Sequence, residues 1–234
     1  SDLWNVASSE FERSVLAAYA KEVSYDAELK FWSGLTAATQ TAIAALTPGA
    51  GQGAVGAAEQ TWAAAQTPAL VDGVIGRMIY NGGAVGGRLK VAGTTITSSN
   101  IKTEYDKVYA KIPAVVLNSP VPCRIYAPYS HLQFINQFNN VATNYKDVFI
   151  VTDLGKPTQK VFFYGLEVVF VPLPENCVIA AIPEHLLWAT DLSSDINKME
   201  INKIANNRED YFVKHIFTIF AHVMNQAYNV LYLG

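Results

Sequence analysis

One segment of this sequence has the pattern of a nucleotide-binding loop. Gly51 to Gly56 read Gly-Gln-Gly-Ala-Val-Gly and match G-x-G-x-x-G, in which backbone amides approach the pyrophosphate of a dinucleotide. That fold also needs a β-strand that leads directly into the first glycine, whereas here the approach is rich in alanine and ends in Thr47-Pro48. We therefore expect a flexible glycine loop and no cofactor, with a nucleotide-binding oxidoreductase as a remote alternative.

The four histidines are candidates for metal binding and for proton transfer near neutral pH. They are His131, His185, His215 and His222. His215 and His222 are seven residues apart, and in a β-strand this odd spacing would place them on opposite faces. We expect core or interface positions for the histidines and no metal site.

Two pairs of carboxylates could serve as general acid and base, namely Asp191 with Asp195 and Glu209 with Asp210. Asp191 precedes two serines, a context in which aspartate is favoured for turn and cap bonding, and the second pair lies in a polar connection. The sequence also contains no phosphate-binding G-x-x-x-x-G-K-[ST], no G-x-S-x-G and no H-E-x-x-H. We therefore expect no catalytic residues and a protein that is not an enzyme.

The two cysteines, Cys123 and Cys177, are too few for a disulfide-stapled scaffold and lack the paired spacing of a zinc site. We expect two reduced structural thiols. Ser1 to Glu10 contain no basic start followed by an apolar core, so no signal peptide is predicted. These features favour synthesis in a reducing cytoplasm.

The composition indicates a surface that other subunits bury. Of the 234 residues 50% are hydrophobic and only 16% are charged, against about a quarter in typical domains. The formal net charge of -3 argues against a dedicated nucleic-acid reader, which carries a basic excess. Any contact with DNA should therefore be weak and without sequence specificity.

Two long stretches contain few charges but do not predict membrane spans. Phe31 to Ala58 contain no charged residue, yet threonine, glutamine and glycine are common there and Pro48 interrupts the run. Tyr211 to Leu233 are broken by Lys214 and several other polar residues before a span length is reached. The glycine, alanine and threonine content of the first stretch instead predicts a loop or extended arm.

Hydrophobic spacing predicts several helices. An amphipathic helix begins near Ser8 and runs to about Lys21, and a second helical stretch includes Tyr25 to Trp32. Pro68 to Tyr80 predict a buried helix that Asn81-Gly82-Gly83 ends. Thr97 to Asn100 are cap candidates for a helix that contains Ile101 to Tyr109 and ends at Pro113, and Ser130 to Phe138 predict a shorter helix.

The remainder of the chain predicts short strands. A long strand over Tyr211 to Phe220 is expected to pair with a last strand, Tyr228 to Leu233. The other predicted strands are Arg88 to Ile96, Cys123 to Ala127, Val148 to Thr152, Val161 to Tyr164, Leu166 to Val171, Cys177 to Ile182 and Leu186 to Thr190.

The order of these segments is similar to that of a known family. Thr95 to Ile101 open a helix, Val108 to Pro113 close it, and Arg124 to Pro128 follow; then come Gly165 to Pro172, Val178 to Ala181 and Leu187 to Leu192. In this order the chain resembles the major capsid proteins of tailed double-stranded DNA bacteriophages, which have the Hong Kong 97-type capsid fold. The resemblance covers residues 68 to 234 and lies in segment order more than in any single residue.

The resemblance implies an α+β fold with an N-terminal arm, an extended loop, a peripheral domain with a spine helix, and an axial domain. Residues 1–60 would form the arm and extended loop, and 61–120 the peripheral domain with the spine helix. Residues 121–200 would form the axial domain, and 201–234 the terminal strands of the peripheral domain.

The same resemblance implies a structural function. Family members assemble with copies of themselves into pentamers and hexamers, which close into an icosahedral shell around packaged double-stranded DNA. Portal, scaffold or decoration proteins are the further partners implied, and no cofactor, metal or membrane is expected. The location implied is the virion capsid, after assembly in the host bacterial cytoplasm. An encapsulin-like compartment shell, which encloses cargo enzymes, is the alternative within this fold.

Overall fold

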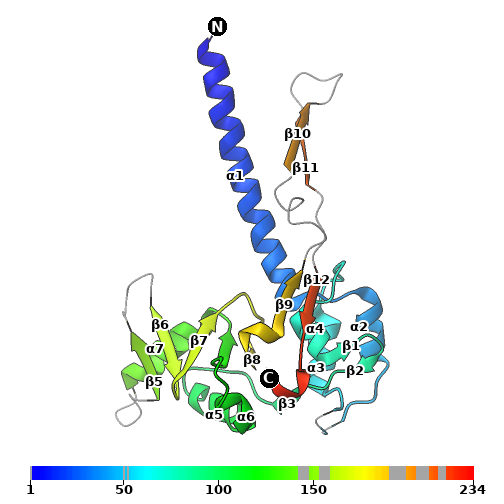
Figure 1. The fold of residues 1–234 in the computed structure, drawn as a ribbon, viewed down its shortest axis with the longest axis vertical. Helices are drawn as coiled ribbons and strands as arrows, with labels where there is room; N and C mark the ends of the chain where they lie inside the picture. The colour runs from blue at the N-terminus through cyan, green and yellow to red at the C-terminus, as the bar shows by residue number, and fades with distance from the viewer. Residues whose placement is uncertain are drawn as a thin grey trace.

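The computed structural model describes residues 2–49, 51, 53–141, 148–152, 159–189, 199–203, 211–215 and 220–234, with the backbone alone for 2–12, 199–203 and 211–215. The fold is mixed α and β, with helices around a large mixed sheet. This agrees with the predicted α+β class. A long N-terminal helix and a β-hairpin project from this compact part in the same direction (Figure 1). Within the described residues, no helix combines the length and the apolar character that a membrane span requires.

The projecting helix α1 spans Asp2–Ser33 and joins the two helical stretches that the sequence predicts separately. No glycine or proline lies between them, so nothing in the backbone interrupts the helix. The helix ends at Gly34, where an added Cβ would lie 2.5 Å from the carbonyl oxygen of Lys30. Of the side chains described in α1, which begin at Arg13, those in the last turns enter the core, where the rings of Phe31 and Trp32 meet edge to face at 5.1 Å.

The uncharged stretch after α1 is not the continuous loop or arm that its composition predicts. It contains α2 (Ala37–Ala44), and it ends at the start of α3 (Ala57–Ala65). Alanine has the highest helix propensity, and the Thr36 side chain accepts the Thr39 amide at the start of α2. The described residues between α2 and α3, which include most of the glycine motif, lie outside helices and strands, as do residues 34–36.

The helix predicted over Pro68 to Tyr80 is shorter in the structure, where α4 spans Val74–Ile79. The amides of Ala69 and Gly73 donate to the carbonyl oxygens of Leu35 and Gly34, at 2.8 Å each, and so hold residues 69–73 against the end of α1. After α4, strands β1 (Tyr80–Asn81) and β2 (Ala84–Val85) form a hairpin. The two residues at its centre, Gly82 and Gly83, have positive φ. The residues predicted to end a helix therefore form the tight turn of a hairpin.

A seven-stranded sheet forms the centre of the compact part, in the order β3-β13-β8-β4-β7-β6-β5. β3 pairs parallel to β13 and β4 parallel to β7, and the other neighbours are antiparallel. All seven lie where strands are predicted. Their bounds are β3 Leu89–Ala92, β4 Arg124–Ala127, β5 Phe149–Thr152, β6 Lys160–Phe163, β7 Leu166–Phe170, β8 Cys177–Ala181 and β13 Val230–Leu233.

The sheet is buried on both faces. Every residue of the central strand β8 is buried, and successive residues contribute to two different hydrophobic clusters. One cluster contains the end of α1 with α3 and α4. The other contains α5 (Ile101–Lys111), α6 (Ala114–Leu117) and α7 (Ser130–Val141), of which α5 and α7 confirm predicted helices.

The predicted pairing of the last strand is wrong. Strand β13 pairs with β3 and β8, whereas β12 (Phe220–Val223) pairs with β9 (Leu186–Ala189), which follows the short 3-10 helix η1 (Pro183–His185). A second 3-10 helix, η2 (Gln226–Tyr228), precedes β13. The long strand predicted from Tyr211 contains β11 (Tyr211–His215), which pairs antiparallel with β10 (Met199–Lys203).

Strands β10 and β11 form the second projection in Figure 1. The seven-stranded sheet combines strands from the residues assigned to the peripheral domain, β3 and β13, with strands from those assigned to the axial domain. The division of the chain into a peripheral and an axial domain stays a prediction.

Candidate functional site

The glycine motif does not have the geometry of a dinucleotide site. Helix α2 precedes it in place of the β-strand that such a site requires. At the start of α3, the amide of Gly56 already donates to Oε2 of Glu59 at 2.7 Å. The Glu59 carboxylate also pairs with the guanidinium of Arg88, and both side chains are buried. A carboxylate thus occupies the helix N-terminus that would otherwise attract a phosphate.

His131, the second residue of α7, lies in the core with no solvent exposure. Its Nε2 is 2.8 Å from the carbonyl oxygen of Glu175 and therefore carries the proton, so Nδ1 accepts from the hydroxyl of Tyr105 at 3.0 Å. Burial lowers the pKa of His131 to about 4, and burial raises that of Tyr105. His131 is therefore a neutral structural residue at physiological pH.

The other candidates for chemistry have no partners that would form a site among the described residues. No group of three or more histidine, cysteine, aspartate or glutamate side chains in that part of the chain could hold a metal ion. Cys123 and Cys177 are buried free thiols, and burial raises the pKa of Cys123 to about 11. The remaining candidates lie outside the part of the chain whose side chains the structure describes; they are Asp191, Asp195, Glu209, Asp210 and His215.

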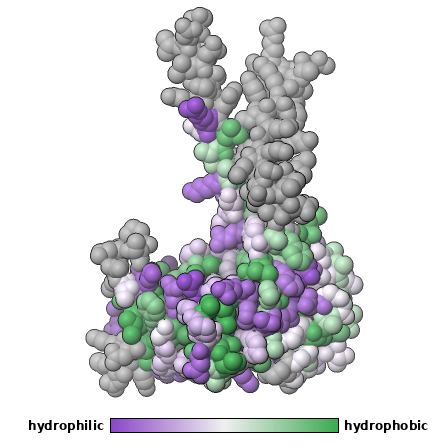
Figure 2. All heavy atoms as spheres, in the orientation of Figure 1, coloured by the Kyte–Doolittle hydropathy of each residue, from purple (hydrophilic) through white to green (hydrophobic). Residues whose placement is uncertain are grey.

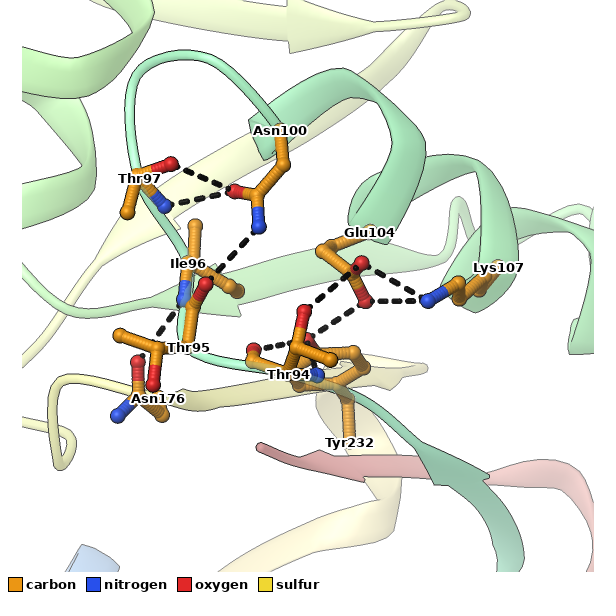
Figure 3. Close-up of polar contacts among 9 residues, drawn as sticks. All are labelled: Thr94, Thr95, Ile96, Thr97, Asn100, Glu104, Lys107, Asn176 and Tyr232. Atoms are coloured by element: carbon orange, nitrogen blue, oxygen red, sulfur yellow. Dashed lines mark hydrogen bonds and ion pairs between the residues drawn. The ribbon is translucent and has the colours of Figure 1, made fainter.

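The most developed polar cluster joins α5 to the end of strand β13 (Figure 3). Lys107 donates to both carboxylate oxygens of Glu104 at 2.8 Å, and Oε1 of Glu104 also accepts from the Thr94 hydroxyl at 3.2 Å. The Tyr232 hydroxyl lies 2.8 Å from Oε2 of Glu104 and 2.7 Å from the carbonyl oxygen of Thr94, and it accepts from the Thr94 amide at 3.0 Å. We name Thr94, Glu104, Lys107 and Tyr232 the carboxylate cluster.

The carboxylate cluster stabilises the fold and is poorly suited to acid or base catalysis. Burial raises the pKa of Glu104, but hydrogen bonds from Lys107 and Tyr232 outweigh burial, so that the pKa is lowered overall. Burial and the nearby Glu104 raise the pKa of Tyr232. A carboxylate that stays ionised beside a hydroxyl that stays protonated has no proton to exchange near neutral pH.

The connection before α5 supports this cluster. The amide of Thr97 donates to Oδ1 of Asn100 at 2.7 Å, and Nδ2 of Asn100 donates to the carbonyl oxygen of Thr95 at 2.9 Å. Asn100 lies at the N-cap of α5, within the predicted cap residues, but its side chain orders the preceding turn and accepts no amide of the first helical turn. The amide of Ile96 donates to Oδ1 of Asn176 at 3.1 Å (Figure 3). Gly93 is required here, because an added Cβ would lie 1.9 Å from Cζ of Tyr232.

The two buried acids, Glu59 and Glu104, are not predicted from the sequence as site residues. For Glu104 a signal exists, because it lies at helical spacing with Ile101, Tyr105 and Val108 on the apolar side of α5. A charged residue on such a face needs a buried partner. Its partner Tyr232 is 128 residues further along the chain, so helical spacing alone does not identify it.

Replacing Tyr232 with phenylalanine should destabilise the protein by about 2 kcal/mol, because the ionised Glu104 and the Thr94 amide would each lose a buried partner. Urea unfolding monitored by circular dichroism would measure this. Tyr228→Phe, at a side chain that is 42% exposed, is the matched control and should change stability by less than about 0.5 kcal/mol. Equal stability of the two variants would contradict the structural role of the cluster.

The described surface carries many exposed apolar side chains. Three apolar side chains, each about 40% exposed, lie on one face of the ribbon that β9 and β12 form: Leu187, Phe220 and Met224. Leu187 lies opposite His222 in the register, and Phe220 and Met224 are two residues before and after His222, so all three share its face. Figure 2 shows hydrophobic residues interspersed with hydrophilic ones over the compact part. Others in this class are Val15, Tyr25, Leu70, Val115, Leu117, Tyr129, Val141, Ile150, Tyr164, Trp188 and Tyr228.

Comparisons of this chain with protein families, with curated proteins and with solved structures found no match.

Proposed function

We propose that this protein is a structural shell subunit of the Hong Kong 97 type, a major capsid protein that assembles into pentamers and hexamers around a bacteriophage double-stranded DNA genome. The observation that carries the proposal is the pair of projections, α1 and the β10–β11 hairpin, which extend from the compact part (Figure 1). A neighbouring subunit would bury them.

The physical chemistry of α1 supports a role in assembly. Its 32 residues correspond to a length of about 48 Å at 1.5 Å per residue. Between Arg13 and Ser33 the buried side chains are Ala27, Phe31 and Trp32, all near the C-terminal end, whereas Val15 is 39% and Tyr25 is 56% exposed. Helices gain most of their stability from packing of an apolar face, so a partner along α1 would stabilise it.

The structure also suggests a different candidate for the spine helix. The resemblance implies that the helix closed by Pro113 is the spine, but that helix, α5, has eleven residues and lies against the central sheet. The longer α1, with β10 and β11, better fits the long helix and terminal strands of a peripheral domain. We propose that α1 is the spine and that the central sheet with α5 and α7 belongs to the axial domain.

The charge of the chain agrees with this function. With a formal net charge of -3, a shell subunit would retain DNA by confinement, without the dense lysine and arginine contacts that make binding tight and salt-sensitive. The exposed apolar face of the β9–β12 ribbon offers surface that subunit contacts would bury.

Purified full-length protein should form capsomers or closed particles, with any precursor or scaffold segment supplied. Light scattering would measure the mass, and negative-stain electron microscopy would show rings or shells. Nuclease-protected DNA in particles from phage-infected cells would favour the capsid, and an enclosed enzyme would favour the compartment shell. A persistent monomer at all concentrations and salt conditions would contradict both.

A further inference from the structure

We infer that Leu70 of one subunit inserts into an apolar pocket beside the glycine loop of the next subunit, so that copies of this chain join head to tail. This inference rests on the proposed shell function and names one contact that would build a capsomer. It also assigns a role to Gly56, the last residue of the glycine motif, which lines this pocket.

Leu70 is an apolar side chain held out from the surface. It is 100% exposed, and the segment around it, Thr67 to Val71, contains no charged residue. The backbone on both sides is fixed: the Ala69 amide donates to Leu35 and the Gly73 amide to Gly34, each at 2.8 Å. Because the loop is already ordered, insertion of Leu70 would cost little conformational entropy.

The side chain of Asp72 fixes the same loop from its other end. Its Oδ1 accepts from the amide of Thr36 at 2.7 Å, and its Oδ2 accepts from the Thr39 hydroxyl at 2.8 Å. The charge nearest to Leu70 in sequence is thus directed toward α2 and its cap. The exposed residues of the loop are Thr67, Pro68 and Leu70, so its surface is apolar apart from its backbone and one hydroxyl group.

The pocket lies at the other end of α3 and has a volume of about 400 Å³. This volume would accept a leucine side chain together with the backbone that carries it. The wall is formed mainly by the small or apolar residues Pro48, Ala57, Ala58, Val91, Ala92 and Leu233.

The charged groups in the pocket wall are already paired within the chain. Nζ of Lys90 donates to the carbonyl oxygens of Gly49 at 2.6 Å and Ala54 at 3.1 Å. The Glu59 carboxylate binds Arg88. An apolar guest would therefore leave these hydrogen bonds and the Glu59–Arg88 ion pair intact, whereas a charged guest would have to compete with them, so the pocket fits an aliphatic side chain.

A second copy of the chain is the occupant that these observations favour. Leu70 and the pocket are separated by the nine residues of α3, a length of about 13 Å, so Leu70 cannot reach the pocket of its own chain. Every copy carries both features, and a contact between two different surfaces of identical subunits is heterologous. Such contacts generate rings when the rotation between neighbours closes, as in a pentamer or hexamer.

Two variants test the contact from its two sides. Leu70→Asp places a charge on the inserting side chain, and Ala58→Phe fills the pocket from an exposed position on α3. Each should raise the protein concentration needed for assembly by about tenfold or more, measured by light scattering. Val141→Asp is the matched control, because Val141 is 83% exposed and remote from the pocket in sequence, and it should assemble as the unmodified chain does. Circular dichroism would verify that all three variants are folded.

Cross-linking tests proximity directly. A mixture of Leu70→Cys and Ala58→Cys chains, oxidised with diamide, should form a disulfide-linked dimer, and a mixture of Val141→Cys and Ala58→Cys chains should not. The native thiols are buried and do not compete. If the unmodified chain assembles but the variants assemble equally well and the dimer is absent, the Leu70 contact is wrong while the shell function stands. If the unmodified chain stays monomeric and no dimer forms, both proposals fail.

Discussion

Replacing Glu59 with glutamine should lower the free energy of unfolding by about 3–5 kcal/mol, because it leaves the Arg88 guanidinium buried without a counter-charge. The side chains of Arg88 and Glu59 are 0% and 3% exposed. Glutamine keeps the size of the side chain and an oxygen that can still accept the Gly56 amide. The decrease in the free energy of unfolding would therefore measure the loss of the negative charge beside Arg88, and not the loss of the hydrogen bond at the start of α3.

Removing both charges should restore most of this stability. In the double variant Glu59→Gln with Arg88→Met no buried charge remains, and we expect it to be within about 2 kcal/mol of the unmodified protein. Urea denaturation at one low protein concentration would compare the single and double variants, since assembly raises apparent stability. Glu22→Gln, at an exposed position on α1, is the control. A single variant as stable as this control would contradict a buried ion pair.

Acid should destabilise the protein through His131. Its pKa is lowered from the usual 6.5 to about 4 by burial, so between these values the unfolded chain binds a proton that the folded chain does not. Stability from this group is complete above pH 6.5 and falls by about 1.4 kcal/mol per pH unit below it. The total loss by pH 4 is about 3 kcal/mol. Protonation would also end the hydrogen bond that Nδ1 accepts from Tyr105.

His131→Gln isolates this effect from other titrating groups. Glutamine cannot take up a proton in this range, although its amide can still donate to the Glu175 carbonyl oxygen. The variant should be less stable than the unmodified protein at pH 7, and the difference should shrink by about 3 kcal/mol as the pH falls to 4. Urea midpoints at pH 7, 5.5 and 4 would measure it. A difference that does not change with pH would contradict a neutral buried His131.

Local signals allowed much of the secondary structure to be predicted. Helix α5 was predicted with its start and its end, because both signals act within a few residues. Asn100 lies at the N-cap, and Pro113 disfavours helical backbone at the residue before it, Ile112. The strands around Gly165 were predicted for the same reason. Tyr164 and Gly165 both have positive φ, the geometry of a tight hairpin turn.

Predictions that depend on distant contacts were less successful. Residues 69–73 form no helix, because two of their amides bind the end of α1. The last strand was predicted to pair with its neighbour in sequence, but it is inserted between β3 and β8. Hydrophobic spacing indicates which residues are buried, and it does not indicate which strand lies beside them.

The glycine motif and the buried acids illustrate the division between sequence and tertiary structure. The sequence alone determined that the 51–56 segment lacks a leading strand, that the chain is poor in charge, and where α5 and the two strands beside Gly165 form, because these properties depend on residues close together in the chain. Only the tertiary structure decided that Glu59 faces Arg88, that Glu104 faces Tyr232, and that Leu70 is exposed while a pocket opens at the far end of α3. Each of these depends on segments that approach one another only when the sheet and its helices have packed.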